Sequence, residues 1–308
     1  YKIPTARSKE FFNVKDFAAY MKKYGGTKMV VKKNGLAAGK GVLESAEKEE
    51  LYSFGEEILR TDSLLIEEFL KGYEITSLAL TDGKSWAALP PCADFKKALD
   101  NDQGRNSGGM GAICPVPIVN AQLMNTIEKT IIKPTFEGLA KEHLCYKGVL
   151  YFGLMITAGG PRLLEYNVRF GDPEAQVVLP LIETDFGNIC HAMKTEKLSE
   201  TPITYSQNSS LGVVVASSGY PGTYETGKTV TFTGEPQEKN GVIFHSATQM
   251  DGDGKVRTSG GRCFTVVGFG QNLVSANKQA YETVHLVKFD GAYYRSDIGK
   301  RFFMENME

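Results

Sequence analysis

The stretch from Pro161 to Gln176 carries the residues best suited to chemistry. Glu165, Asn167 and Arg169 alternate there with apolar residues, and this period of two predicts a half-buried strand. Oxygen ligands two residues apart suit Mg²⁺, which proteins usually hold with one or two carboxylates together with substrate phosphates. A nearby arginine can pair with the same phosphates. The pattern therefore indicates a phosphorylated ligand, or alternatively a strand whose polar face is only solvated.

A Gly-Pro turn, FGDPE, follows this strand and adds the carboxylates of Asp172 and Glu174. Turns of this kind often carry functional side chains, but they also serve simply to reverse the chain. Both interpretations stay open from the sequence.

A glycine-rich loop from Gly35 to Gly41 lies between two short predicted strands, and Lys32 and Lys40 supply positive charge beside it. The loop is not a Walker A motif, because its glycines are too close together and no Ser or Thr follows Lys40. It is not a dinucleotide fingerprint, because a strand follows the glycines. The loop could be a phosphate lid, since glycines let backbone N–H groups approach an anion. The alternative is a mobile hairpin.

The segment from Cys92 to Pro117 is polar at its centre, and we expect a long loop with little regular structure. Lys96 and Arg105 flank the run Ser107 to Gly111, which could form a backbone nest for a phosphate or carboxylate. A disordered surface loop is the alternative. Long loops in compact domains are commonly binding loops or lids, which favours function.

Elements with helical or strand periodicity must position these segments. Helical spacing predicts helices over residues 14–24, 46–59, 120–142 with an interruption near Pro134, 175–181, 185–193 and 273–287. Strands are predicted over residues 29–31, 42–43, 64–66, 75–80, 148–157 and 162–169. Glu67 to Leu70 should link two of the strands. The polar stretch 198–210 predicts a domain boundary, after which short strands alternate with Gly and Pro turns, and Asp251 to Gly254 reads as a hairpin turn.

Composition narrows the class of protein. The chain has 308 residues, with 35 Lys plus Arg against 36 Asp plus Glu, so its overall charge indicates neither a nucleic-acid nor a membrane-surface partner. Five widely spaced cysteines indicate reduced thiols in a cytoplasmic protein. The four histidines form no zinc-binding pair. No apolar run is long enough to cross a bilayer.

The motifs gain specificity from their order along the chain. GLAAGKGV, IEEFLKGYE, NSGGMGA, NVRFGDPE, GYPG, GGR and YYRSDIG follow one another, and together they resemble the glycinamide ribonucleotide synthetases, the phosphoribosylamine–glycine ligases of purine synthesis. The resemblance runs from Ile3 nearly to the carboxyl end. It implies an α+β ATP-grasp fold, in which two α+β lobes clasp ATP, followed by a small mixed α/β domain. We expect a lid subdomain over residues 1–71, a large subdomain with the metal and substrate site over 72–205, and a carboxyl-terminal domain over 206–308.

The resemblance also implies an activity. Family members join glycine to 5-phosphoribosylamine with ATP and Mg²⁺ or Mn²⁺, through an acyl phosphate. The family has a further amino-terminal domain, and we expect this chain to be a fragment that begins after it and that could be inactive alone. In some eukaryotes the family is fused to later purine enzymes. Other ATP-grasp carboxylate–amine ligases, a nucleotide-binding module and a structural domain of a multifunctional chain stay open as alternatives.

Residue roles follow from the family pattern, position by position. Three positions depart from that pattern, Phe95, Arg105 and Ser107, and the first two could alter substrate contacts. The nucleotide would be bound by Lys32, Gly39, Lys40, Gly41, Glu67, Glu68, Leu70 and Glu74; the metal by Glu165 and Asn167; the substrates by Ser107, Gly108, Gly109, Met110 and Gly111; and catalysis would involve Asp94, Lys96, Arg169 and Asp172.

Overall fold

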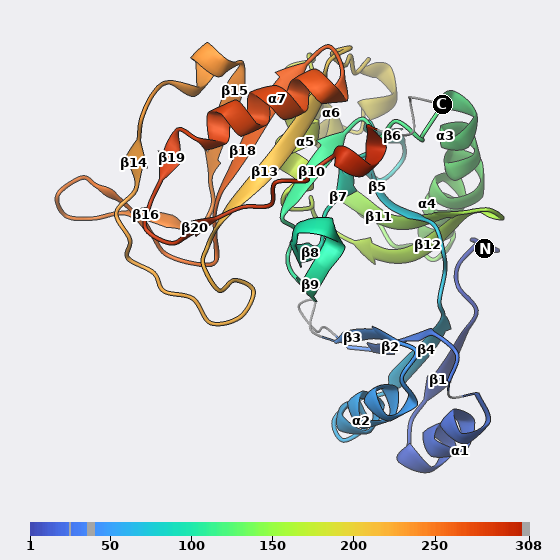
Figure 1. Ribbon diagram of the computed structural model, residues 1–308. Coiled ribbons are helices and arrows are strands. Elements are labelled where there is room, and N and C mark those ends of the chain that lie inside the picture. The colour runs from blue at the N-terminus through green and yellow to red at the C-terminus, as the bar shows by residue number, and fades with distance from the viewer. Residues whose placement is uncertain (25, 36–40, 304–308) are drawn as a thin grey trace. The chain divides into compact units, whose positions relative to one another are not determined.

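The computed structural model describes residues 1–24, 26–35 and 41–303 (Figure 1), without the side chains of residues 237 and 239. The chain divides into two compact units. The larger unit contains Tyr1–Ile3, Glu74–Leu154 and Glu165–Glu308, and the smaller unit contains Pro4–Tyr73 and Met155–Leu164.

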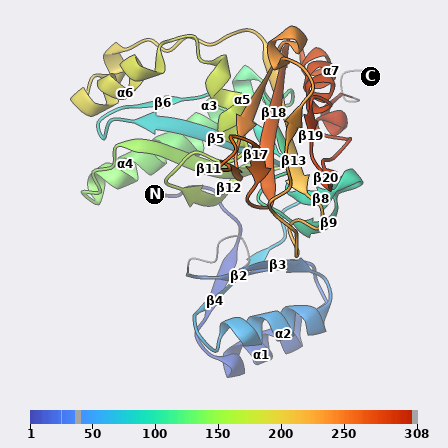
Figure 2. The same cartoon turned by 90° about the vertical axis from the view of Figure 1, so that its left-hand side faces the viewer.

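The smaller unit is a four-stranded antiparallel sheet with the strand order β1-β4-β2-β3. Both of its helices lie on one face of the sheet (Figure 2). The apolar stripes predicted from helical spacing form the core, where Phe17 and Met21 of one helix meet Leu51 and Ile58 of the other. These elements are β1 Ser8–Phe11, α1 Val14–Tyr24, β2 Met29–Lys33, β3 Val42–Ser45, α2 Lys48–Ile58 and β4 Leu64–Glu68.

The hairpin around the glycine-rich loop forms as predicted. Strands β2 and β3 pair antiparallel, with Lys32 opposite Val42, and the N–H of Lys33 donates to the carbonyl of Gly41 at 2.8 Å. Residues 36–40, which include Gly39 and Lys40, lie outside the described residues. One expectation is wrong here, since Glu67 and Glu68 belong to strand β4 and do not link two strands.

The main sheet of the larger unit has the order β15-β18-β13-β10-β7, with β20 paired beside β13. Helix α7 packs on β18 and β13 (Figure 1). The predicted hairpin turn at Asp251 is confirmed, because β16 and β17 pair across it. The sheet strands and the helix are β7 Ala93–Asp94, β10 Gly111–Cys114, β13 Ser209–Ser217, β15 Gly241–His245, β18 Arg262–Gly270, β20 Ala292–Tyr293 and α7 Leu273–Val284. Two separate strand pairs accompany them, β14 Thr231–Phe232 with β19 Val287–Lys288, and β16 Thr248–Met250 with β17 Val256–Thr258.

A second sheet has the order β12-β11-β5-β6. The helical stretch predicted over residues 120–142 forms, and the interruption expected near Pro134 is confirmed, because a π-helical turn over Glu128–Ile132 separates α3 from α4. This turn lies directly before Pro134, which has no backbone N–H to donate and occupies the first turn of α4. These elements are β5 Tyr73–Thr81, β6 Trp86–Ala88, α3 Ala121–Ile127, α4 Lys133–Lys141, β11 Gly148–Thr157, β12 Gly160–Asn167, α5 Glu174–Val178 and α6 Phe186–Thr195.

The loop predicted between Cys92 and Pro117 is largely regular structure. Besides β7 and β10, it contains a hairpin of β8 Lys97–Leu99 and β9 Gln103–Asn106. Strand β10 pairs with β13, about a hundred residues later in the chain, so its partner cannot be read from local sequence. The same pairing makes residues on both sides of the polar stretch 198–210 part of one sheet. The domain boundaries at 71/72 and 205/206 stay predictions.

In the part of the chain that the structure describes, no helix combines the length and apolar character needed to span a membrane.

Gly268 allows β18 and α7 to approach closely. A Cβ at this position would lie 2.1 Å from the backbone nitrogen of Ala280 and 2.5 Å from the carbonyl oxygen of Ala276. We therefore expect Gly268→Ala to lower the free energy of unfolding by about 1–3 kcal/mol or more through overpacking. Urea denaturation would measure this change. Gly252→Ala is a matched control, because nothing lies within 4 Å of its Cβ position, and an equal loss in both variants would contradict the explanation.

Candidate functional site

A charged cluster in the larger unit joins three of the predicted residues. Glu74 is the second residue of β5, Asp94 ends β7 and Lys96 follows two residues later. The ammonium group of Lys96 forms an ion pair with Oε1 of Glu74, and Asp94 is buried beside it. Sequence assigned Glu74 to the nucleotide ribose and the other two residues to catalysis, and the fold brings all three together.

The cluster shifts the pKa values of its members. The pKa of Asp94 is raised to about 7. Burial is the main cause, the nearby carboxylates of Glu174 and Glu74 act in the same direction, and the charge of Lys96 opposes them. Burial lowers the pKa of Lys96, but the charges of Asp94 and Glu74 outweigh burial and raise it overall. Lys96 therefore stays a cation, while Asp94 can hold or release a proton near neutral pH.

Glu174 belongs to this region, although sequence reasoning gave it no role. Its side chain is buried, and its Oε1 accepts a hydrogen bond from the hydroxyl of Tyr151 at 2.9 Å. Thr76 in turn donates to that hydroxyl at 2.8 Å. Burial raises the pKa of both Glu174 and Tyr151. Glu174 is the second acidic residue of the FGDPE motif, so the sequence did draw attention to it. A sequence alone, however, does not show which acidic side chains of a turn are buried.

Residues 107–111, which the sequence predicts to bind substrates (the substrate loop), contact the FGDPE turn of residues 170–174. Gly109 has a φ of +109°, and a Cβ there would lie 2.5 Å from Cδ of Pro173, so both the conformation and the packing require glycine. The two most specific motifs of the sequence therefore meet.

Four of the five backbone N–H groups of the loop are already engaged, which argues against the anion-nest interpretation. The N–H groups of Ser107 and Met110 donate to the carbonyls of Lys96 and Phe95, both at 2.7 Å. The N–H of Gly109 donates to Oγ of Ser107 at 3.1 Å, and that of Gly108 donates to the hydroxyl of Tyr220 at 2.9 Å. The loop is therefore held by its own surroundings.

The predicted metal ligands lie on one strand. Glu165 and Asn167 end β12, and the amide nitrogen of Asn167 lies 3.3 Å from Oε1 of Glu165. A carboxylate and an amide that share a strand face are oxygen donors of the kind that Mg²⁺ accepts alongside phosphates and water. Among the described residues, no group of three or more His, Cys, Asp or Glu side chains could hold a metal alone. The exposed Arg169 donates to the carbonyl of Phe170 at 2.8 Å.

Asp172 lies beside a hollow of about 380 Å³. Its Oδ1 accepts from the amide of Gln176 at 3.2 Å and lies 3.4 Å from Nη1 of Arg262. The hollow is lined by Asp172, Gln176, His245, Ser246, Ala247 and Arg262.

Phe95 is buried in the packing of the larger unit, and its expected effect on substrate contacts stays a prediction. Its side chain is 2% exposed, and its ring packs edge-on against Phe302 and under the guanidinium of Arg301. Arg295, buried nearby, donates to the carbonyl of Lys97 at 2.9 Å and forms ion pairs with Asp297 and Asp102. The motif YYRSDIG therefore anchors the segment that leads to the substrate loop.

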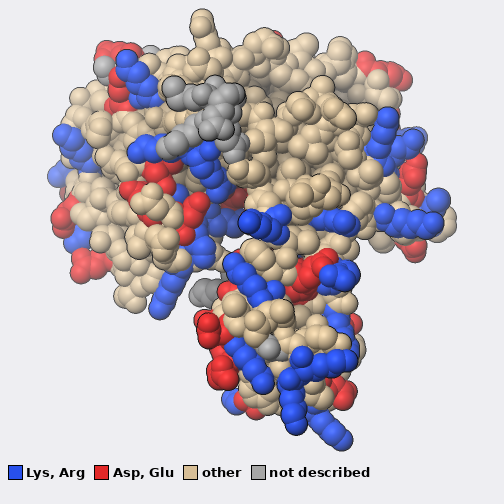
Figure 3. Space-filling model, turned by 45° about the vertical axis from the view of Figure 1, so that its right-hand side comes forward, with Lys and Arg blue, Asp and Glu red and all other residues tan. Residues whose placement is uncertain are grey.

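The smaller unit carries the other predicted nucleotide-binding residues. Lys32 and Glu67, on adjacent strands β2 and β4, form an ion pair of 2.6 Å, and Glu67 is buried. Glu68 is engaged by Arg7, whose Nε donates to its Oε2 at 2.7 Å, and this hydrogen bond lowers the pKa of Glu68. Leu70 is half-buried. Figure 3 shows Lys and Arg side chains mixed with acidic ones on the visible surface of this unit.

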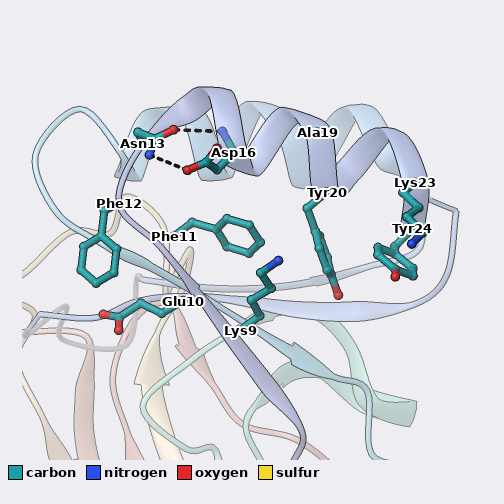
Figure 4. A pocket seen from close by; sticks show the side chains of 10 residues that line it. All are labelled: Lys9, Glu10, Phe11, Phe12, Asn13, Asp16, Ala19, Tyr20, Lys23 and Tyr24. Carbon is teal, nitrogen blue, oxygen red and sulfur yellow. Dashed lines mark hydrogen bonds between the residues drawn. The ribbon is translucent and has the colours of Figure 1, made fainter.

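A hollow of about 450 Å³ between β1 and α1 contains none of the predicted site residues (Figure 4). The ammonium of Lys9 lies 5.2 Å from the ring centroid of Phe11 and 5.3 Å from that of Tyr20. Asn13 and Asp16 cap the start of the helix by hydrogen bonds to each other. These contacts account for the polar residues there as part of the structure of the unit.

Comparisons with known proteins agree with this arrangement. Residues 1–175 match the family model of the ATP-grasp (A) domain of phosphoribosylglycinamide synthetase, and residues 210–301 match its C domain. A phosphoribosylamine–glycine ligase of Synechocystis is 40% identical over 97% of this chain and 72% of that protein. The crystal structure of the Thermotoga maritima phosphoribosylamine–glycine ligase has a TM-score of 0.86 and 36% identity, and the match covers 96% of this chain and 75% of that chain. A trifunctional purine biosynthetic protein of Gallus gallus is 41% identical over 97% of this chain.

The fold and the charged site thus define an ATP-grasp protein. More particularly, the chain belongs to the phosphoribosylglycinamide synthetase family, which confirms the resemblance found in the sequence. The chain spans 30% of the length of the Gallus gallus trifunctional protein.

The buried carboxyl of Asp94 makes a prediction about stability and pH. Its pKa of about 7 in the folded chain exceeds the value of about 3.9 expected in the unfolded chain, so the folded state retains a proton that the unfolded state releases. The stabilising contribution is complete below about pH 4 and is lost as the pH rises through about 7. Relative to the wild type, Asp94→Asn should therefore gain up to about 2–3 kcal/mol of unfolding free energy between about pH 5 and pH 8. Urea titrations at both pH values would check this, and a difference independent of pH would contradict it.

Proposed function

We propose that the chain carries out, or forms the catalytic part of a protein that carries out, the ATP-dependent joining of glycine to 5-phosphoribosylamine. The products are glycinamide ribonucleotide, ADP and phosphate. The observation that carries the proposal is the cluster of Glu74, Lys96 and Asp94 beside the substrate loop, in a chain that belongs to this family along most of its length. The reaction serves purine biosynthesis, and a cytoplasmic location is part of the proposal, in agreement with five free cysteines.

The reaction has two steps. A carboxylate oxygen of glycine attacks the γ-phosphorus of ATP, and ADP leaves as a P–O bond breaks, which gives glycyl phosphate. The amine nitrogen of phosphoribosylamine then attacks the carbonyl carbon, phosphate leaves, and the nitrogen loses a proton. Transfer of a phosphoryl group needs alignment and charge neutralisation more than a protein nucleophile.

Each set of residues has a task in this proposal. Lys32, Lys40 and the Gly39 to Gly41 loop would bind phosphates, while Glu67, Glu68, Leu70 and Glu74 would bind the adenosine part. Glu165 and Asn167 would hold Mg²⁺ or Mn²⁺, which neutralises phosphate charge when bound. Lys96 and Arg169 would balance negative charge on the substrates, since both are cations on the larger unit. Asp94, Asp172 and the substrate loop would orient glycine and the amine.

A further part of the proposal concerns the length of the protein. Similar proteins include the trifunctional protein of Gallus gallus and a bifunctional purine biosynthetic protein of Schizosaccharomyces pombe, of which the chain spans 38%. We propose that the chain can function within a larger multifunctional protein.

Glu165→Ala should abolish turnover by removing the carboxylate ligand of the metal. We expect a fall in glycine-dependent ADP formation of at least about a hundredfold, equivalent to about 3 kcal/mol of transition-state stabilisation. ADP formation would be measured with ATP, Mg²⁺, phosphoribosylamine, and glycine present or omitted. Glu183→Ala, which removes an exposed carboxylate with no assigned role, should leave the rate unchanged. Undiminished turnover by Glu165→Ala would overturn the assigned role, and ADP formation by the wild type that ignores glycine would overturn the ligase proposal.

A further inference from the structure

Arg262, at the start of β18, is bound to both of the segments that meet at the site. Its Nη1 donates to the carbonyl oxygens of Gly108 and Asp172, each at 2.6 Å. The same nitrogen lies 3.4 Å from the carbonyl oxygen of Gly109 and 3.4 Å from Oδ1 of Asp172. One guanidinium group thus ties the substrate loop to the FGDPE turn.

Tyr220 binds the other backbone polar group of Gly108. Its hydroxyl accepts the N–H of Gly108 at 2.9 Å, while Arg262 takes the carbonyl of that residue. Gly261 leaves room for the tyrosine, because a Cβ there would lie 2.3 Å from Cδ2 of Tyr220. The motifs GYPG and GGR, which the proposed reaction does not itself use, therefore converge on Gly108.

We propose that Arg262 is a positioning residue that fixes the substrate loop against the FGDPE turn, so that the loop and Asp172 meet the substrate in one arrangement. The inference deepens the proposed function and rests on it for the identity of the substrate. Charged hydrogen bonds to two carbonyls are stronger than neutral ones, and the planar guanidinium gives them a fixed direction. The side chain of Arg262 is only 21% exposed, so water competes weakly for these bonds.

Arg257 offers a matched control, five residues earlier in the chain. Its Nη1 donates to the carbonyl of Gly227 at 3.1 Å and to Oγ1 of Thr229 at 3.0 Å, and its Nε pairs with Asp251. Its side chain is 34% exposed. The two arginines therefore make similar bonds, but the partners of Arg257 lie outside the predicted site residues.

Hydrogen–deuterium exchange tests the positioning without any need for turnover. Arg262→Gln should speed exchange of the amides of residues 107–111 at least about tenfold, with Arg262→Lys intermediate. Arg257→Gln should leave these amides unchanged. Tyr220→Phe, which removes only one acceptor, should speed exchange of Gly108 and serves if Arg262→Gln does not fold. Unchanged exchange in the variants of Arg262 and Tyr220, or equal acceleration by Arg257→Gln, would overturn the proposal.

Steady-state kinetics separates positioning from a general loss of structure. Arg262→Gln should raise the KM for glycine about tenfold and leave the KM for ATP within about twofold, with partial rescue in Arg262→Lys. An unchanged KM for glycine together with faster exchange of the loop would overturn the positioning role. A wild type with no glycine-dependent ADP formation would defeat the proposed function, and the exchange result would still decide whether Arg262 fixes the loop.

Discussion

The arrangement of the larger unit depends on keeping the ammonium of Lys96 among carboxylates. A charged aspartate buried alone would be strongly unfavourable, and Asp94 is buried with the cation of Lys96 close to it, while Lys96, 36% exposed, pairs with Glu74 on β5. The buried carboxyl of Glu174 adds a second constraint and is satisfied by the hydroxyl of Tyr151. These pairings fix the strands that carry the charged residues, and a site organised in this way needs little rearrangement to bind a charged ligand.

A third constraint comes from the chain after residue 206, whose side chains bind the segments of the site. Arg262 and Tyr220 hold Gly108, and Arg295 holds the hairpin that precedes the substrate loop. Ring packing of Phe302 against Phe95 completes the contact. The late motifs of the sequence thus have a physical role at the site even where they carry no chemistry, since a loop with four of its five backbone N–H groups engaged depends on its supports for its shape.

Local patterns were sufficient to predict most of the fold. Helix α1 matches its predicted range of residues 14–24, and the strand that carries Glu165 was predicted from its alternation. The strand that carries Lys32 was predicted from its β-branched residues over 29–31 and extends to Lys33. The strands β7 and β10 were missed because their pairing depends on β13, which is remote in sequence. At the site, residue types indicated Glu165 and Asn167 as metal ligands, which stays a prediction, but the inward direction of Glu174 and Phe95 depends on tertiary packing. The same packing occupies the N–H groups of the substrate loop, so composition alone could not decide whether the loop is an anion nest.

The most direct test of the account is whether the charged residues of the larger unit take part in a metal–nucleotide site. A calorimetric titration of a non-hydrolysable ATP analogue with Mg²⁺ into the 308-residue chain, with Glu165→Ala titrated in parallel, measures this without turnover. The account predicts binding by the wild type and an affinity at least about tenfold lower in the variant, equivalent to about 1.4 kcal/mol. Equal affinity in the two proteins, or no binding by either, would contradict it.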